Sequence, residues 1–203
     1  SRHIYAKISS VKSRLIILQA NKKQKLNEWN YTHLPCIEMI EVPSHECSCF
    51  MDLGCPIYRS KYPIPKILTT INGELIDYVS NIDVSKIYSK TTRRESLVKK
   101  GNRYTKFDFK YVLENGYIYI LDSQAPKVLR LKAIFEDQVA AISFPSACNS
   151  GDCIDCGCKD PQQEILAIDP ELIEVLIEAC VGELIDKFSQ GRRDEQNNSK
   201  EEN

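Results

Sequence analysis

Apolar residues near the front of the chain recur at the spacing of a helix. These positions are Ile4, Ile8, Val11, Leu15 and Leu18. Steps of four, three, four and three residues place them on one face of a helix, with the cations Lys7 and Lys12 outside that face. The pattern predicts an amphipathic helix over about residues 4–27. A strand is the alternative for residues 14–20, because that stretch has no strict period.

The middle of the chain carries the pattern of a sheet. Asn72-Gly73 and Asn115-Gly116 are two-residue turn signals between β-forming residues. The second is the stronger signal, because residues 107–111 alternate before it and residues 117–120 form a β-prone run after it. Residues 128–135 have the composition of a further strand. This part of the sequence therefore predicts an antiparallel β-meander.

A second amphipathic helix is predicted near the end of the chain. Asp169 is suited to an N-cap, and Pro170 follows at the first helical position. The predicted helix extends to about Phe188. Its polar side is formed by Glu171, Glu174, Glu178, Glu183 and Asp186. The rest of its circumference is apolar, so it needs more than one partner: either the first helix and the sheet together, or a neighbouring subunit.

These elements predict an α+β fold with an N-terminal amphipathic helix, a central antiparallel β-meander and a C-terminal amphipathic helix. The 203 residues, of which 42% are hydrophobic, suffice for one composite domain. The expected segments are an N-terminal helix (1–30), a cysteine-bearing linker (31–63), an antiparallel β region (64–145), a cysteine-rich loop (146–162), a C-terminal helix (163–190) and a flexible tail (191–203). The tail is expected to be mobile because it is polar and has no aromatic or β-branched residue.

Charge is distributed unevenly, although the net charge is only −1. Residues 1–30 carry a net +6, residues 86–110 a net +7 and residues 151–189 a net −8. The basic segment from 86 to 103 is expected to be an exposed loop or a short helix. Complementary charges of this kind favour head-to-tail contact between copies. The alternative is three solvated faces that contact no partner.

The sequence predicts neither a membrane span nor a secretory leader. Its longest uninterrupted apolar run covers residues 15–18, whereas a bilayer span needs roughly 20 residues. The first residues lack the apolar core of a secretory signal. We therefore expect the protein to be made in a reducing cytosol, where clustered cysteines bind metal or stay reduced more often than they form disulfides.

The cysteines are the principal candidate chemistry. Eight of the nine fall into two clusters, namely Cys36, Cys47, Cys49 and Cys55, and Cys148, Cys153, Cys156 and Cys158. The first cluster, with His45, has enough soft ligands for a tetrahedral structural zinc, although Cys-x-Cys is a less common zinc spacing than Cys-x-x-Cys. A disulfide formed later and reduced, packed cysteines remain alternatives. The second cluster suits a local zinc loop or an ion shared between both clusters, and no other cofactor is expected.

No enzyme class is indicated. The sequence has no nucleophile–base pair, phosphate loop or paired-carboxylate signature, so no catalytic or cofactor-binding residue is assigned. Cys153 and Cys156 form a Cys-x-x-Cys within a loop rather than at a helix N-terminus, which disfavours a thiol oxidoreductase. A zinc-containing nucleic-acid-binding protein is the alternative function, but a pI near 6.3 argues against it.

Three segments carry a family resemblance. The first runs from residue 35 to Arg59 and contains Cys36, His45, Cys47, Cys49 and Cys55. The second is Lys61-Tyr62-Pro63-Ile64-Pro65-Lys66. The third is Asp169-Pro170-Glu171-Leu172-Ile173 together with the helix that it begins. Together they resemble the ring, or head-to-tail connector, structural proteins of crAss-like, short-tailed bacteriophages. The resemblance covers nearly the whole chain, and residues 148–158 look like an addition.

The resemblance implies a non-enzymatic virion protein at the portal vertex, assembled in the host cytoplasm. It would form a homo-oligomeric ring, expected to be twelvefold, that extends the DNA conduit and bridges portal to tail. The implied partners are further copies of the chain, the portal, other tail and ring proteins, and DNA passing through the lumen without sequence-specific contact. No membrane contact is implied.

Two groups of residues are candidate ring interfaces. They are the basic Arg93, Arg94, Lys99 and Lys100, and the C-terminal-helix residues Glu171, Glu174, Glu178, Leu184 and Phe188. The basic group could face DNA or an acidic neighbour. We favour the neighbour, because a conduit that bound DNA tightly would retard ejection.

Overall fold

The computed structural model describes residues 2–42, 57–92, 94–95, 109–120, 125–147 and 166–201, with backbone alone at residues 2–3 and 187–201. The helices are α1 (Arg2–Asn21), the 3-10 helix η1 (Glu28–Asn30), α3 (Gln138–Ile142) and α4 (Pro170–Glu201). The strands are β1 (Thr32–Glu41), β2 (Tyr58–Ser60), β3 (Thr69–Thr70), β4 (Gly73–Glu74), β5 (Ile76–Asn81), β6 (Ile87–Lys90), β7 (Lys110–Glu114), β8 (Tyr117–Ile120) and β9 (Val128–Ala133). The α+β class is confirmed.

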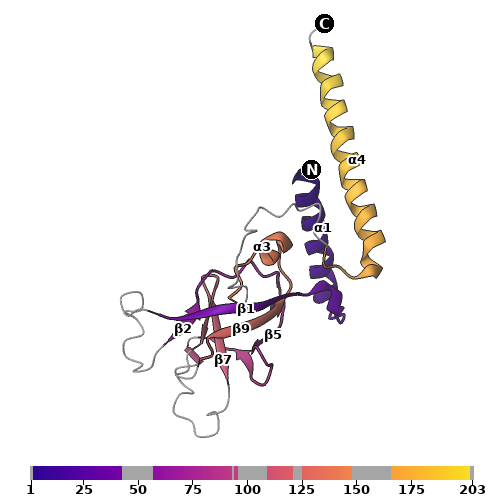
Figure 1. Ribbon diagram of the computed structural model, residues 1–203. Coiled ribbons are helices and arrows are strands. Elements are labelled where there is room, and N and C mark those ends of the chain that lie inside the picture. Colours follow the sequence, from indigo (N-terminus) through magenta and orange to yellow (C-terminus); the bar gives the residue numbers. More distant parts are fainter. Residues whose placement is uncertain are drawn as a thin grey trace.

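Seven of these strands close into a barrel in the order β1-β2-β8-β7-β6-β5-β9 (Figure 1). Closure leaves no unpaired edge among them. The buried core of the barrel includes Leu34, Ile37, Met39, Val79, Tyr88, Tyr111, Ile118, Ile120, Leu129 and Leu131. Aliphatic and aromatic side chains therefore fill the interior, which is a packed core rather than a channel.

A bulge allows β1 to contribute to two sides of the barrel. Its register against β9 shifts between Leu34 and Ile37, and the successive residues Cys36 and Ile37 are both buried. Pro35 lies at this point, where its missing N–H removes no regular ladder bond. Beyond the bulge, the end of β1 pairs with β2. The range 31–63, expected to be a linker, thus contains two barrel strands.

The Asn115-Gly116 turn prediction is confirmed. Glu114 pairs with Tyr117 in the β7–β8 hairpin. Asn115 and Gly116 have φ angles of 52° and 78°, the left-handed conformation that both central residues of a tight hairpin turn require. Turn chemistry within the hairpin is therefore enough to predict this element from the sequence.

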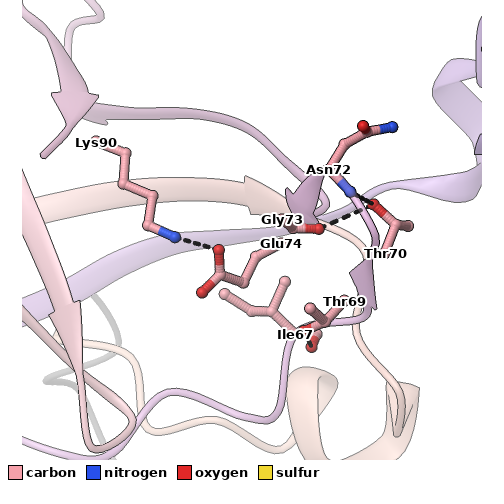
Figure 2. Close-up of polar contacts among 7 residues, drawn as sticks. All are labelled: Ile67, Thr69, Thr70, Asn72, Gly73, Glu74 and Lys90. Carbon is pink, nitrogen blue, oxygen red and sulfur yellow. Dashed lines mark hydrogen bonds and ion pairs between the residues drawn. The ribbon is translucent and has the colours of Figure 1, made fainter. Parts of the chain in front are cut away.

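A hairpin also forms at the Asn72-Gly73 signal, between β3 and β4, but its turn lies one residue earlier than predicted: Thr70 pairs with Gly73, so Ile71 and Asn72 are the loop residues. The Thr70 hydroxyl donates to the Gly73 carbonyl oxygen at 3.0 Å and accepts from the Asn72 backbone N–H at 3.2 Å, as Figure 2 shows. On the next residue, Glu74 forms an ion pair with Lys90 of β6. The small hairpin is therefore attached to the barrel wall.

The predicted meander is not the observed topology. β8 pairs with β2, and β9 pairs with β1 and β5 rather than with β8. Strands β1 and β2, from the supposed linker, insert between β8 and β9. One contact in the barrel is parallel, because Ser89 and Lys90 of β6 pair with Lys110 and Tyr111 of β7.

α1 ends at Asn21, earlier than predicted. Lys23 adopts a left-handed conformation with φ 57°, and the Gln24 backbone N–H donates to the Gln19 carbonyl oxygen at 3.2 Å. A left-handed residue directly after a helix ends it and satisfies its last carbonyls. The chain then turns into η1.

α4 begins at Pro170 as predicted, but it continues to Glu201. The range 191–203, expected to be a flexible tail, is therefore helical as far as residue 201. It contains no proline, and Arg, Glu, Gln and Lys favour a helix. Figure 1 shows α1 and α4 side by side at one end of the barrel, with α4 extending past the N-terminal end of α1.

The face that α1 buries differs from the prediction. Ile16 is fully buried against Leu68 and Ile134 at the barrel end. Lys12, expected to point outward, is buried, whereas Leu18 is 50% exposed. The reason is that α1 packs between two partners, the barrel end and α4, and so buries two sides instead of one face.

Candidate functional site

The paired helices share an apolar contact. Val11 of α1 packs against Leu176 and Cys180 of α4, and all three are buried. Partly buried Ile8, Leu15, Leu166, Ile168 and Ala179 surround them. Fully burying an aliphatic side chain stabilises by about 1.5–3 kcal/mol. The inner side of α4 is therefore buried within the chain, and the prediction that Cys180 is a core residue is confirmed.

Glu183 adds a polar contact between the two helices. One of its carboxylate oxygens accepts from Arg14 Nη2 at 2.6 Å, and the other forms an ion pair with Lys7. Lys7 and Arg14 are seven residues apart and so lie on the same side of α1. The groups are partly solvated, so the pairs contribute modestly to stability while they fix the register of α4 on α1.

The start of α4 is held by a buried polar pair. Asn30 Oδ1 accepts from the Asp169 backbone N–H at 2.9 Å, and both residues are buried. Asp169 Oδ1 in turn accepts from the Glu171 N–H at 3.1 Å, which confirms its role as N-cap. η1 therefore determines where α4 begins.

A buried amide joins α1 and α3 to the segment before α4. Gln138 Oε1 accepts from Lys12 Nζ at 3.2 Å and from the Ala167 N–H at 2.7 Å. Burial lowers the pKa of Lys12 to about 8. These contacts orient both helices against the barrel.

The outer side of α4 carries an exposed apolar row, here called the α4 ridge. Ile173, Ile177, Val181 and Ile185 are 43%, 56%, 48% and 60% exposed. A spacing of four residues places them in one row. A contiguous exposed row of large apolar side chains is typical of a surface that another molecule covers.

The predicted interface residues are distributed as follows. On α4, Glu171, Glu174 and Glu178 are exposed and Leu184 is half-buried, while Phe188 lies in the part described by backbone alone. Arg94 is exposed, whereas Arg93, Lys99 and Lys100 lie outside the described residues. The acids therefore share α4 with the α4 ridge, and their role in an interface stays a prediction.

Most of the predicted metal ligands lie outside the described residues. These are Cys47, Cys49, Cys55, Cys148, Cys153, Cys156 and Cys158. Cys36 is buried in β1 and disulfide-bonded. Within the described ranges, no group of three or more His, Cys, Asp or Glu side chains is placed to hold a metal. Cys36 is therefore not free to act as a metal ligand, and the choice between zinc and disulfide stays open for the seven cysteines outside the described residues.

The sequence analysis missed a second exposed apolar feature, the β5–β6 turn. Ile82 and Ile87 are 49% and 60% exposed. Asn81 holds the turn by donating from Nδ2 to Ser85 Oγ at 2.9 Å and accepting from the Lys86 N–H at 2.9 Å. Only the exposure of these large apolar residues in the folded barrel reveals it.

One family model, described as phage tail ring protein 2, matches the chain over residues 1–203. The match covers the barrel and the paired helices alike. No curated protein matches the chain. In the part of the chain that the structure describes, no helix is both long and apolar enough to span a membrane.

Proposed function

The chain belongs to the phage tail ring protein 2 family of crAss-like phages, and we propose that it is a subunit of a ring in the head-to-tail connector, between portal and tail. The family name indicates a structural tail component of the virion, which favours a non-enzymatic role. In the proposed role the ring extends the DNA conduit, and twelvefold symmetry is the expected arrangement.

The α4 ridge is the observation that carries this proposal. A closed ring of identical subunits requires that each copy present a surface that contacts the next copy. The four side chains of the ridge are large, apolar and about half exposed. Burying them would contribute several kcal/mol at about 25 cal/mol per Å² of apolar surface, which offsets part of the cost of association.

Charge supports contact between copies. Lys22, Lys23 and Lys25 are exposed just after α1, whereas Glu174 and Glu178 are exposed beside the α4 ridge. Opposite charges on separate surfaces of one chain steer copies toward each other, and a net charge of −1 adds little overall repulsion.

The basic segment 86–110 fits a protein contact better than tight DNA binding. Lys90 is already in an ion pair with Glu74. Lys86 Nζ lies 4.8 Å from the centre of the Phe109 ring. Cations engaged within the barrel are less available to neutralise phosphates. DNA would then pass through the proposed lumen without tight retention.

Native mass spectrometry under reducing conditions tests the proposal, with portal absent and present. We expect a closed ring, or a monomer that joins a ring when portal is added. Ile177→Glu should abolish that assembly, while Val175→Glu, on an exposed position outside the α4 ridge, should leave it unchanged. A wild-type chain that stays monomeric with portal would contradict the proposal. A salt-sensitive gel shift from that monomer would instead support nucleic-acid binding.

The same spectra address the cysteine clusters. Extra mass in zinc-sized steps, removed by a chelator, is the expected sign of a structural zinc. A second spectrum recorded without reductant identifies disulfides by a loss of two mass units per bridge relative to the reduced chain. This result is independent of whether the ring forms.

A further inference from the structure

A groove of about 670 Å³ runs along α1, beside its contact with the barrel end. Ala6, Ser10 and Ser13 line it on α1, with Leu18 at one end. Leu68 and Asp137 form the opposite wall. The small side chains on one side of α1 leave room for another helix to approach closely, and the leucines give the groove an apolar end.

The walls of this α1 groove are held together by hydrogen bonds within the chain. Ser9 Oγ donates to the Glu136 carbonyl oxygen at 2.8 Å, and Tyr5 Oη donates to Asp137 Oδ1 at 3.5 Å. Asp137 Oδ1 also accepts from the Val139 N–H at 3.0 Å at the start of α3. The groove is therefore preformed, so an occupant need not order it.

The α4 ridge matches the α1 groove in length. From Ile173 to Ile185 a helix rises about 18 Å, and from Tyr5 to Leu18 it rises about 20 Å. A row of apolar residues spaced four apart is the usual way in which a helix occupies such a groove. The ridge cannot reach the groove of its own chain, because Leu176 and Cys180 hold α4 against Val11.

Charge sets the direction of the contact. Glu174 and Glu178 lie at the N-terminal end of the α4 ridge, while the exposed Lys22 and Lys23 follow the Leu18 end of the groove. Asp137 lies near the Tyr5 end of the groove, where it accepts a hydrogen bond from Tyr5 Oη. Glu174 and Glu178 meet Lys22 and Lys23 only if the incoming α4 runs antiparallel to α1.

We propose that the α4 ridge of one copy lies in the α1 groove of the next copy. This inference rests on the proposed ring function and adds the receiving surface to it. Ridge and groove are different surfaces, so every copy offers one of each and the contact is heterologous. A repeated heterologous contact continues around until the ring closes.

Two variants test the contact, Ile177→Glu in the α4 ridge and Ser10→Glu in the α1 groove. Each variant alone should remain monomeric by native mass spectrometry at a concentration where the wild type assembles. A one-to-one mixture should give a dimer of one copy of each and nothing larger. The intact ridge of the Ser10→Glu copy can bind the intact groove of the Ile177→Glu copy. The two surfaces left free on this dimer are the altered groove and the altered ridge, so no further copy can add.

The controls are Val175→Glu and Ser10→Ala, which should both assemble like the wild type. Circular dichroism of all variants checks that the exposed substitutions leave the fold intact. Normal assembly of Ser10→Glu, with Ile177→Glu still monomeric, would overturn the groove while leaving the ridge contact and the ring function in place. A wild-type chain that stays monomeric, even with portal, would overturn the ring function itself.

A charge exchange tests the orientation separately. Glu174→Lys with Glu178→Lys should weaken assembly, as should Lys22→Glu with Lys23→Glu. All four changes in one chain should restore it, because opposite charges face each other again. Failure of the combined chain to recover, with both pairs weakened, would overturn the antiparallel arrangement.

Discussion

Lys12 Nζ donates a hydrogen bond to Gln138 Oε1 at 3.2 Å, and both side chains are buried. The acceptor is a neutral amide, and in the described part of the chain no carboxylate forms an ion pair with this ammonium group. Burial therefore lowers the pKa of Lys12 to about 8. At neutral pH the fold retains a largely uncompensated buried charge, which costs stability.

Lys12→Met should raise the free energy of unfolding at pH 7. Methionine has nearly the same volume and removes the desolvation cost, while Gln138 still accepts from Ala167. Between a folded pKa of about 8 and the ordinary value of 10.5, the unfolded wild-type chain binds the additional proton. Wild-type stability from this group therefore rises with pH across that window, by roughly 3 kcal/mol in total.

Urea unfolding of both proteins at pH 7 and at pH 10 measures the effect. The advantage of Lys12→Met should be constant below about pH 8 and should shrink as the pH approaches 10.5. An advantage that does not change with pH would show that Lys12 has an ordinary pKa.

Asp169→Ala should destabilise the start of α4. It removes the acceptor for the Glu171 N–H, and loss of an N-cap side chain costs about 1 kcal/mol. Asp169→Asn is the matched control, because an asparagine oxygen can accept the same bond. Thermal unfolding should show a lower midpoint for alanine than for asparagine, and equal midpoints would contradict the capping role.

Glu183→Gln should lower the free energy of unfolding by about 0.5–1 kcal/mol at low salt. The amide can still accept a hydrogen bond from Arg14, but the charge attraction to Arg14 and Lys7 is lost. Because salt screens such pairs, the gap to the wild type should close in about 1 M salt. Glu174→Gln, on the solvated side of α4, is the control expected to change little. A gap that persists in salt would assign the loss to packing.

Two glycines should respond to alanine in opposite directions. Gly182 lies inside α4, and an added Cβ would have no atom within 4 Å. Alanine there should stabilise by about 0.5–1 kcal/mol. Gly116 has φ 78°, so alanine at that position should destabilise by about 1–2 kcal/mol. Denaturant unfolding of the two variants checks both signs, and equal shifts would contradict the turn geometry.

Turns and helix caps, which depend on neighbouring residues, could be predicted from the sequence. The pairing of strands far apart in the sequence could not. The Asn115-Gly116 hairpin and the Asp169 cap depend on residues within a few positions of one another. β1 was missed because Pro35 and the bulge break its alternation, and its partner β9 begins almost ninety residues further on. Pairing over such a distance leaves no local signal.

The candidate site was predictable in part for a similar reason. The excess of apolar residues on the last helix indicated a second partner. The side on which Val11 packs decides which of them stay exposed, and this depends on the way α1 lies against the barrel end. Burial of Lys12 follows from the same packing and contradicts its expected outward position.

The pairing of early with late segments has a consequence during translation. Thr32 pairs with Ala133, and Val11 packs against Leu176. Neither the barrel nor the helix pair can be completed while the ribosome is still making the middle of the chain, because the later partner of each pair does not yet exist. Contacts between residues so far apart also form slowly once both partners are present. A nascent subunit therefore has no finished wall at Asp137. In the proposed ring, a copy can therefore be recruited only after its chain has been made past Asp137 and this wall has folded, which separates synthesis from oligomerisation in time.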